Sequence, residues 1–245
     1  MLAPIARRAA SFLFPSRCLA CDTGPVERLW RGGVCDVCWG AIPELDAARC
    51  ASCDEALPGA EPDARCGRCL LDPPAFDALR AAAPYAGSGR RILLAFKFRG
   101  ADYLAGHLAG AMAARLRSPH ADEVVAVPAT ARRRRERGYH PAALLAAALA
   151  RRLDLPHRPA RLRKVRETER QSLVPAARRR ANVRRAFAVE GTPASRVLLV
   201  DDVATSGATA RECAARLRAA GAERVVVWCF ARASRADAIE PETAP

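Results

Sequence analysis

The chain has 245 residues, of which 51% are hydrophobic, so it can form one α/β domain with a sizeable core and a small additional module. Its formal net charge is +14, and only Lys97 and Lys164 among its 40 basic residues are lysines; this composition favours binding to phosphate groups, although codon-driven use of arginine would also produce it. No apolar run approaches the roughly 18 residues that a membrane helix requires, which argues against an integral membrane protein.

The N-terminal segment, residues 1–16, is interrupted by Pro4, Arg7 and Arg8 and leads directly to Cys18. A secretory signal has an uninterrupted apolar stretch followed by a cleavage site of small residues. We therefore predict a short amphipathic helix over 1–16, in a cytoplasmic protein without a membrane span.

Eight of the ten cysteines form four CxxC pairs in the N-terminal part of the chain. Two cysteines at this spacing on a tight turn can direct both thiolates at one tetrahedral ion, and a second pair after a hairpin completes the site. A disulfide framework is the alternative, but the chain shows no secretion signal and a cytosol keeps thiols reduced. We therefore predict a double zinc ribbon over residues 17–72 with two Zn²⁺ ions. The predicted ligands are Cys18, Cys21, Cys35, Cys38, Cys50, Cys53, Cys66 and Cys69.

The order of the pairs predicts how they share the two ions. If the first pair joins the second and the third joins the fourth, each site needs only local loops, so we prefer this partition to a cross-braced one. An all-cysteine site has no open position for water or substrate, so both ions should be structural. Four arginines flank the ligands and could offset the negative charge of the thiolates: Arg17, Arg49, Arg65 and Arg68.

From Phe76 onwards, apolar runs alternate with helical stretches, which is the pattern of a parallel sheet with crossover helices. We predict an α/β domain over residues 76–232 and a disordered tail over 233–245. The predicted strands are 122–127, 196–202 and 224–230, and the predicted helices are 139–153 and 209–220, with Gly221 as a candidate cap of the second helix.

Segment 197–209, VLLVDDVATSGAT, is the strongest functional signal in the chain. Consecutive backbone N–H groups at a turn of small residues, followed by a helix N-terminus, bind anions, and the Thr and Ser hydroxyls can add donors. Asp201 and Asp202 would repel a phosphate, so they should serve a ribose hydroxyl pair or a cation that accompanies the anion. Neither a GxxxxGK[ST] P-loop nor a GxGxxG dinucleotide motif is present.

The same segment resembles the 5-phosphoribosyl-1-diphosphate (PRPP) signature of type I phosphoribosyltransferases. LFPSRC with its CxxC pairs, ILLAFKFRG, VPATARRRRERGYH and TERQSLVPAARRRANVRRAF together resemble the ComF family, also called competence protein F. The resemblance spans residues 13–230 and implies a type I phosphoribosyltransferase fold, a parallel sheet flanked by helices, with a small N-terminal zinc-ribbon module. One departure is RGYHP at 137–141, where family members commonly read RGYNQ.

The resemblance also implies roles for the matching positions around PRPP. Asp201 and Asp202 would bind the ribose hydroxyls, and Mg²⁺ would accompany the diphosphate. The 5′-phosphate would lie in the turn formed by Ala204, Thr205, Ser206, Gly207, Ala208 and Thr209.

Two loops and one apolar stretch would complete the site. The loop over 128–138, with Arg133 and Arg137, corresponds to the diphosphate-binding loop, and Lys97 and Arg99 would face the diphosphate. A flexible loop over 167–182 would close over the site with Thr168, Gln171 and Arg179.

These assignments imply a PRPP-binding, phosphoribosyltransferase-like protein that acts in DNA uptake or nucleotide metabolism, with competence proteins as partners. The acceptor and the catalytic residues stay unassigned, and so does the question of whether transfer occurs. A second hypothesis is a non-enzymatic PRPP sensor that binds single-stranded DNA through arginines at 178–180, 184 and 185 and through Trp30 and Trp39, although both tryptophans could equally fill the ribbons. A third is a zinc-ribbon interaction protein with a degenerate PRPP pocket.

Overall fold

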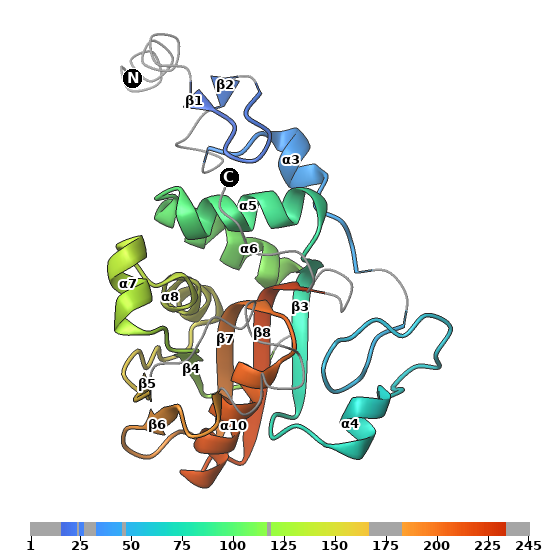
Figure 1. The fold of residues 1–245 in the computed structure, drawn as a ribbon, viewed down its shortest axis with the longest axis vertical. Coiled ribbons are helices and arrows are strands. Elements are labelled where there is room, and N and C mark those ends of the chain that lie inside the picture. The colour runs from blue at the N-terminus through green and yellow to red at the C-terminus, as the bar shows by residue number, and fades with distance from the viewer. Residues whose placement is uncertain are drawn as a thin grey trace.

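The structure is a computed structural model that describes residues 16–23, 25–26, 33–45, 48–116, 119–166 and 183–233 (Figure 1). A four-stranded parallel sheet forms its centre. The strand order is β3 (Ala78–Pro84), β8 (Arg224–Arg232), β7 (Arg196–Ala204) and β4 (Glu123–Ala126). Strands covered on both faces require continuous apolar runs, which VLLV in β7 and VVVW in β8 supply.

One face of the sheet is covered by three helices, of which α6 and α8 pack against each other. This layer consists of α5 (Gly87–Phe98), the 3-10 turn η1 (Asp102–Leu104), α6 (Ala105–Arg115) and α8 (Pro141–Leu153). Alternate strand residues, including Leu198, Val200 and Trp228, belong to its core cluster. The period of two residues along a strand explains why their neighbours face the other side.

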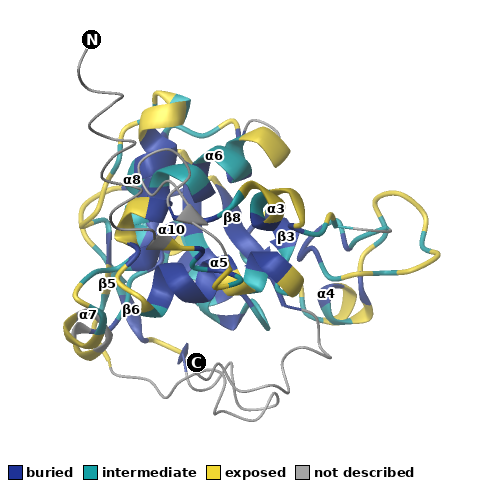
Figure 2. Cartoon of the chain, turned by 90° about the horizontal axis from the view of Figure 1, so that it is seen from above, coloured by how far each residue is buried: buried dark blue, intermediate teal, exposed yellow. Residues whose placement is uncertain are grey.

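The opposite face is covered by α10 (Ala208–Ala219) and by the antiparallel hairpin of β5 (Leu162–Lys164) and β6 (Phe187–Val189). Its cluster takes the remaining strand residues, such as Val197, Leu199 and Val227. Figure 2 shows the buried residues gathered in the sheet and on the inner sides of the helices, with exposed residues on the outer turns.

The cysteine-rich region contains little regular structure, as expected for ribbons held by metal. Its elements are the paired strands β1 (Ser16–Arg17) and β2 (Pro25–Val26) and the short helices α3 (Asp36–Gly40) and α4 (Gly67–Leu71). The first ribbon lies beside α5, and the second lies beside β3 (Figure 1). Each ribbon therefore belongs to the core cluster of a different face of the sheet.

The three predicted strands and two predicted helices are confirmed. β7 and β8 each continue two residues beyond the predicted ends because Ala204 and Arg232 stay paired in the ladder. α8 begins at Pro141, where proline is favoured at the first helical position. Gly221, with φ of 113°, follows α10 in a conformation that favours glycine.

The segment after β4 differs from the continuous loop expected over 128–138. It contains a helix, α7 (Ala131–Arg137). Alanine and arginine are good helix formers, and Gly138, with φ of 78°, ends the helix. The prediction of a loop throughout this segment is therefore wrong.

Within the described ranges, no helix is long and apolar enough to cross a bilayer. Three predicted segments fall largely or wholly outside these ranges: the helix over 1–16, apart from Ser16 in β1, the flexible loop over 167–182, and the tail over 233–245, apart from Ala233.

Candidate functional site

The predicted phosphate turn lies at the carboxyl end of β7, an interior strand between β8 and β4. Ligands of open α/β sheets bind outside the carboxyl ends of the strands. Gly207 precedes α10 with φ of 72°, which disfavours any residue with a side chain. No atom of the described residues lies within 4 Å of the position that its Cβ would occupy, so the backbone angle rather than crowding calls for glycine here.

The amides of the turn are arranged to receive an anion. Within the described part of the chain, the N–H groups of residues 205, 206 and 207 donate to no acceptor. The next N–H, of Ala208, donates to the Oγ of Ser206 at 3.3 Å. Because α10 starts here, its first turn adds the partial positive charge of a helix N-terminus. Successive unpaired donors at a helix start are the features of a phosphate site.

Two carboxylates border this turn on its β7 side. The Oδ1 of Asp202 lies 3.3 Å from the Nζ of Lys97, and this lysine side chain is only 3% exposed. The Oδ1 of Asp201 accepts a hydrogen bond of 2.9 Å from the Asp202 N–H. The structure thus brings Lys97, which the family resemblance places near the diphosphate, against one of the two predicted ribose carboxylates.

Asp201 is electrostatically distinct from an ordinary surface carboxylate. Burial raises its pKa well above the usual value, the negative charge of Asp202 raises it further, and Lys97 opposes both effects. The pair therefore resists carrying two full negative charges. Its carboxylate oxygens can accept hydrogen bonds from hydroxyl groups of a ligand.

Other predicted contacts lie elsewhere or outside the described residues. Arg99 is exposed and directs Nη1 towards the carbonyl oxygen of Leu19 at 3.4 Å. The guanidinium of Arg137 lies over the ring of Phe98, 4.6 Å from its centroid. Arg133 belongs to α7, but its side chain is not described. Thr168, Gln171 and Arg179 all lie outside the described residues.

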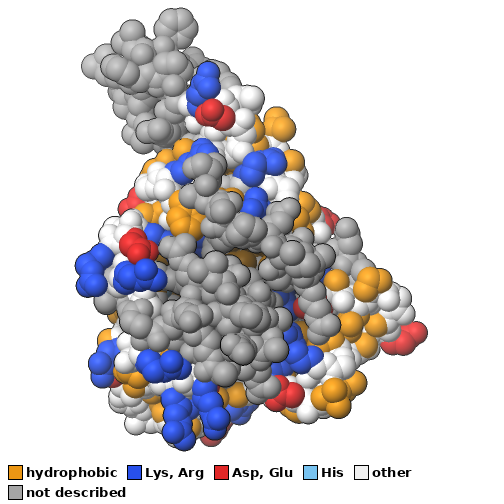
Figure 3. All heavy atoms as spheres, in the orientation of Figure 1, with side chains coloured by type: hydrophobic (Ala, Val, Ile, Leu, Met, Phe, Trp, Pro, Cys, Tyr) orange, Lys and Arg blue, Asp and Glu red, His pale blue; other side chains and the backbone are white. Residues whose placement is uncertain are grey.

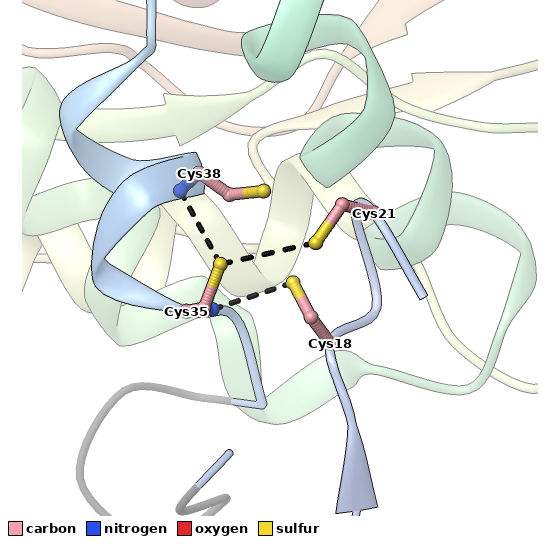
Figure 4. A group of neighbouring side chains, drawn as sticks. All are labelled: Cys18, Cys21, Cys35 and Cys38. Atoms are coloured by element: carbon pink, nitrogen blue, oxygen red, sulfur yellow. Dashed lines mark hydrogen bonds between the residues drawn. The ribbon is translucent and has the colours of Figure 1, made fainter. Parts of the chain in front are cut away.

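The first four cysteines converge as predicted (Figure 4). Their four Sγ atoms lie within 4.8 Å of one another. The N–H of Cys35 donates to the Sγ of Cys18 at 3.3 Å, and the N–H of Cys38 donates to the Sγ of Cys35 at 3.4 Å. Such N–H···S bonds stabilise thiolates, so this donor set fits a tetrahedral zinc ion.

The second four cysteines form an equivalent but more deeply buried group. Cys50, Cys53, Cys66 and Cys69 are all buried, and their Sγ atoms also lie within 4.8 Å of one another. The N–H of Cys66 donates to the Sγ of Cys50 at 3.3 Å, which repeats the geometry of the first site. The predicted partition of consecutive pairs is confirmed.

The arginines near these sulfurs are mostly not the ones that the sequence singled out. Arg17 pairs with Asp22 and Arg49 pairs with Asp54. Instead, Nη2 of Arg211, on α10, lies 3.5 Å from the Sγ of Cys69. Nothing in the sequence marked Arg211, since it is separated from Cys69 by 142 residues in an arginine-rich chain.

One of the two tryptophans considered for base stacking lies in the described region. Trp39 is half-buried and packs against the first-face core cluster, with its ring centroid 6.0 Å from that of His107. This contact supports the interpretation of Trp39 as ribbon filling. Trp30 lies outside the described residues.

Comparison with known proteins agrees with this two-part architecture. Residues 9–70 match the double zinc ribbon domain, and residues 141–243 match the phosphoribosyl transferase domain. The DNA utilization protein YhgH of Salmonella typhi is 32% identical over 226 residues, covering 89% of this chain and 97% of that protein. Competence protein F of Haemophilus influenzae is 30% identical over 231 residues, covering 90% of this chain and 98% of that protein.

Solved structures give a more partial match. A structure of the allosteric regulatory enzyme of purine biosynthesis is 25% identical over 53% of this chain and 26% of that chain, with a TM-score of 0.37. A superposition of this quality adds nothing to the assignment made from the domain families and the relatives.

Proposed function

Because the chain belongs to the ComF family, in which a double zinc ribbon precedes a phosphoribosyltransferase domain, we propose that it binds PRPP at the turn that follows β7. The observation that carries this proposal is the row of unpaired amides at residues 205–207 beside Asp201 and Asp202. A ligand with a phosphate at one end and vicinal hydroxyls next to it matches both halves of that arrangement. The two zinc ions are structural.

The proposed pose assigns each chemical group of PRPP to one part of the site. The 5′-phosphate lies in the turn of residues 204–209, and the ribose hydroxyls donate to Asp201 and Asp202. Carboxylate oxygens are also ligands that Mg²⁺ prefers, but Asp202 already forms an ion pair with Lys97. Mg²⁺ therefore belongs with the diphosphate in this proposal, where it would neutralise leaving-group charge.

The remaining predicted contacts complete the proposal. Lys97, Arg133 and Arg137 are assigned to the diphosphate side, and Thr168, Gln171 and Arg179 to a loop that excludes water on closure. Residues 17–72 would form the zinc module and 76–232 the transferase domain. If transfer occurs, these residues act by positioning PRPP and stabilising the charge of the departing diphosphate, and no proton-transferring residue is assigned.

Thermal unfolding with PRPP and Mg²⁺ tests the binding proposal. A ligand at 100 times its Kd stabilises the folded state by about 2.7 kcal/mol, so Tm should rise by several degrees. The control is the double variant Asp201→Asn/Asp202→Asn, which keeps the shape of both side chains and should show little or no rise. If the wild-type protein is folded and its Tm does not change at saturating PRPP, the proposal is refuted.

Turnover requires a separate measurement. Incubation with PRPP, Mg²⁺ and a panel of bases and amines should release diphosphate if the chain is a transferase. Binding without release for any acceptor would instead favour the PRPP-sensing hypothesis.

A role in DNA metabolism follows from the names of the relatives, and we include it in the proposal together with a cytoplasmic location and competence proteins as partners. Figure 3, in the orientation of Figure 1, shows Lys and Arg side chains on the molecular surface over α7, β5 and β6. Exposed arginines of these elements include Arg132 and Arg163, which pair with Glu136 and Glu190. Such a surface can contact a phosphate backbone.

Fluorescence anisotropy with single-stranded DNA at increasing salt tests this second activity. Affinity should fall steeply with salt, and Arg184→Glu/Arg185→Glu should weaken it. The matched control reverses another exposed arginine pair, Arg151→Glu/Arg152→Glu, on α8. Equal effects of the two double variants would indicate general charge attraction rather than a defined DNA surface.

A further inference from the structure

Arg232, the last residue of β8, is 2% exposed, and its guanidinium joins the phosphate turn to the second zinc ribbon. Its Nη1 donates to the carbonyl oxygens of Ala204 and Ala233, each at 3.0 Å, and also to that of Thr205. Its Nε donates to the carbonyl oxygen of Cys53 at 3.1 Å. Nη2 completes the set with a 2.6 Å bond to Oε2 of Glu55.

The contacts with Ala204 and Thr205 constrain where the amides of the turn point, together with the Ala233 N–H, which also donates to the Ala204 carbonyl at 2.9 Å. In a trans peptide, the C=O of one residue and the N–H of the next point in opposite directions. No cis peptide occurs in the described backbone. When Arg232 holds the carbonyl groups of residues 204 and 205, the N–H groups of 205 and 206 must face away from it. Among the described residues, these are two of the three N–H groups of the turn that donate to no acceptor.

The other end of the guanidinium is held by a rigid part of the molecule. The second ribbon binds the edge strand β3 through a 2.8 Å bond from the Leu79 N–H to the Ser52 carbonyl and a 3.0 Å bond from the Ala81 N–H to Oδ2 of Asp54. Both ribbon residues are adjacent to Cys53, a ligand of the second site. A zinc ion held by Cys53 and the other three cysteines of this site would therefore fix the loop that supplies the Cys53 carbonyl and Glu55 as acceptors for Arg232.

We propose that Arg232 is a positioning residue for PRPP binding, which uses the second zinc ribbon as a fixed support to orient the amides of the phosphate turn. This inference rests on the proposed function for the identity of the ligand, but the orientation of the turn can be tested without any ligand. Arginine suits the role because its planar fork reaches several acceptors at fixed angles. A lysine would keep the charge and lose the fork.

Hydrogen exchange resolved by NMR measures the rigidity of the turn directly. The reporters are the amides of Ala233 and Arg211, which donate to the turn carbonyls of Ala204 and Gly207, each at 2.9 Å. In Arg232→Lys, both amides should exchange at least about tenfold faster. The Asp122 amide, bonded to the Arg196 carbonyl at the opposite end of β7, should keep its rate.

Two further variants test whether the contact between Arg232 and the second ribbon, rather than a general loss of stability, controls the turn. Glu55→Gln keeps the shape of the ribbon side chain and removes its charge, so it should accelerate the same two amides by a smaller factor. Arg218→Lys is the matched control. Arg218, on α10, donates to two acceptors in the segment after the second ribbon, the Ala75 carbonyl at 2.6 Å and Oδ2 of Asp77 at 2.7 Å. Both contacts lie far from the turn. It should leave both reporter amides unchanged.

PRPP affinity and zinc content complete the test. Arg232→Lys should weaken PRPP binding at least about tenfold while the chain retains two zinc ions, and Arg218→Lys should not weaken it. Unchanged exchange at Ala233 and Arg211, or equal acceleration throughout the protein, would overturn the positioning role. If the wild-type protein does not bind PRPP, the proposed function fails, and the exchange rates alone still decide whether Arg232 orients the turn.

Discussion

The two zinc ribbons have the same ligands and nearly the same loop geometry, yet they join the α/β domain differently. The first is attached by apolar packing of Val34 and Ile42 and by a bond from the Ser88 hydroxyl to the Cys38 carbonyl at 2.6 Å, and its arginine contact, from Arg99 to the Leu19 carbonyl, is exposed. The second is attached by hydrogen bonds to β3 and, in addition, through buried arginines, Arg211 and Arg232, that reach its ligands and their neighbours.

This difference suggests that one ribbon covers a hydrophobic face while the other supports the functional site. Apolar contacts are non-directional and tolerate small shifts. Charge-assisted hydrogen bonds to fixed carbonyls specify direction, and losing one partner leaves the other buried without compensation. Damage to the second ribbon should therefore disturb the phosphate turn, and damage to the first should not.

The largest effect should come from removing one zinc ligand in each ribbon. Cys53→Ser should lower the free energy of unfolding by more than about 4 kcal/mol, the range in which loss of a metal site falls, and should abolish the Tm rise with PRPP. Cys21→Ser, at a half-buried ligand, should cost less and preserve that rise. Urea unfolding and zinc content per chain provide the measurements, and equal loss of the PRPP response in both variants would contradict the comparison.

Removing one arginine that contacts each ribbon should have an intermediate effect on the free energy of unfolding. Arg211→Met leaves Cys69 and Asp72 without their cation and should cost about 2 to 3 kcal/mol. Arg115, which donates to the Pro43 carbonyl at 3.2 Å beside the first ribbon, is exposed, so Arg115→Met should cost under about 1 kcal/mol. The comparison fails if urea unfolding gives the reverse order.

The hydrogen bond of the first ribbon can be removed alone. Ser88→Ala leaves the Cys38 carbonyl without this donor and should cost about 1 kcal/mol. Chelator-induced release of one of the two zinc ions should accelerate, while PRPP affinity should stay at the wild-type value. A weakened PRPP affinity would show that the first ribbon also affects ligand binding at the turn.

The smallest effect concerns the charge at the turn itself. Because the folded-state pKa of Asp201 is raised, the folded protein binds this proton more tightly than the unfolded chain, and stability falls as pH rises from the ordinary value of 3.8 through the raised pKa. Asp201→Asn removes this loss, so its Tm should exceed that of the wild type by at most about 4 °C at pH 8, with the difference shrinking towards pH 4. A difference that does not depend on pH would exclude this origin.

Local features of the sequence were sufficient to predict the zinc sites and the turn. Each zinc site uses cysteines from one short stretch, and the turn combines a strand end, small residues and a helix start in consecutive positions. The strands of apolar runs were predictable for the same reason. β3 was not, because its sequence ALRAAAP lacks the β-branched residues that mark a strand, and its pairing with β8 makes it one.

The contacts that connect the two domains could not be predicted. Arg211 and Arg232 are two of many arginines, and neither lies in a motif. Their ribbon partners are separated from them by 139 to 179 residues, so only the folded arrangement identifies them. Lys97 was expected near the diphosphate, but its ion pair with Asp202 also appears only in the folded arrangement.

The distance in sequence between Arg232 and its ribbon partners also matters during synthesis of the chain. Glu55 and Arg232 are 177 residues apart, so the second ribbon leaves the ribosome long before the residue that locks it to the sheet. Chains normally fold from the N-terminus as they emerge. The second ribbon can therefore collect its zinc early but can complete its docking only when almost the whole chain has been made, which makes the phosphate turn one of the last parts of the protein to take its final shape.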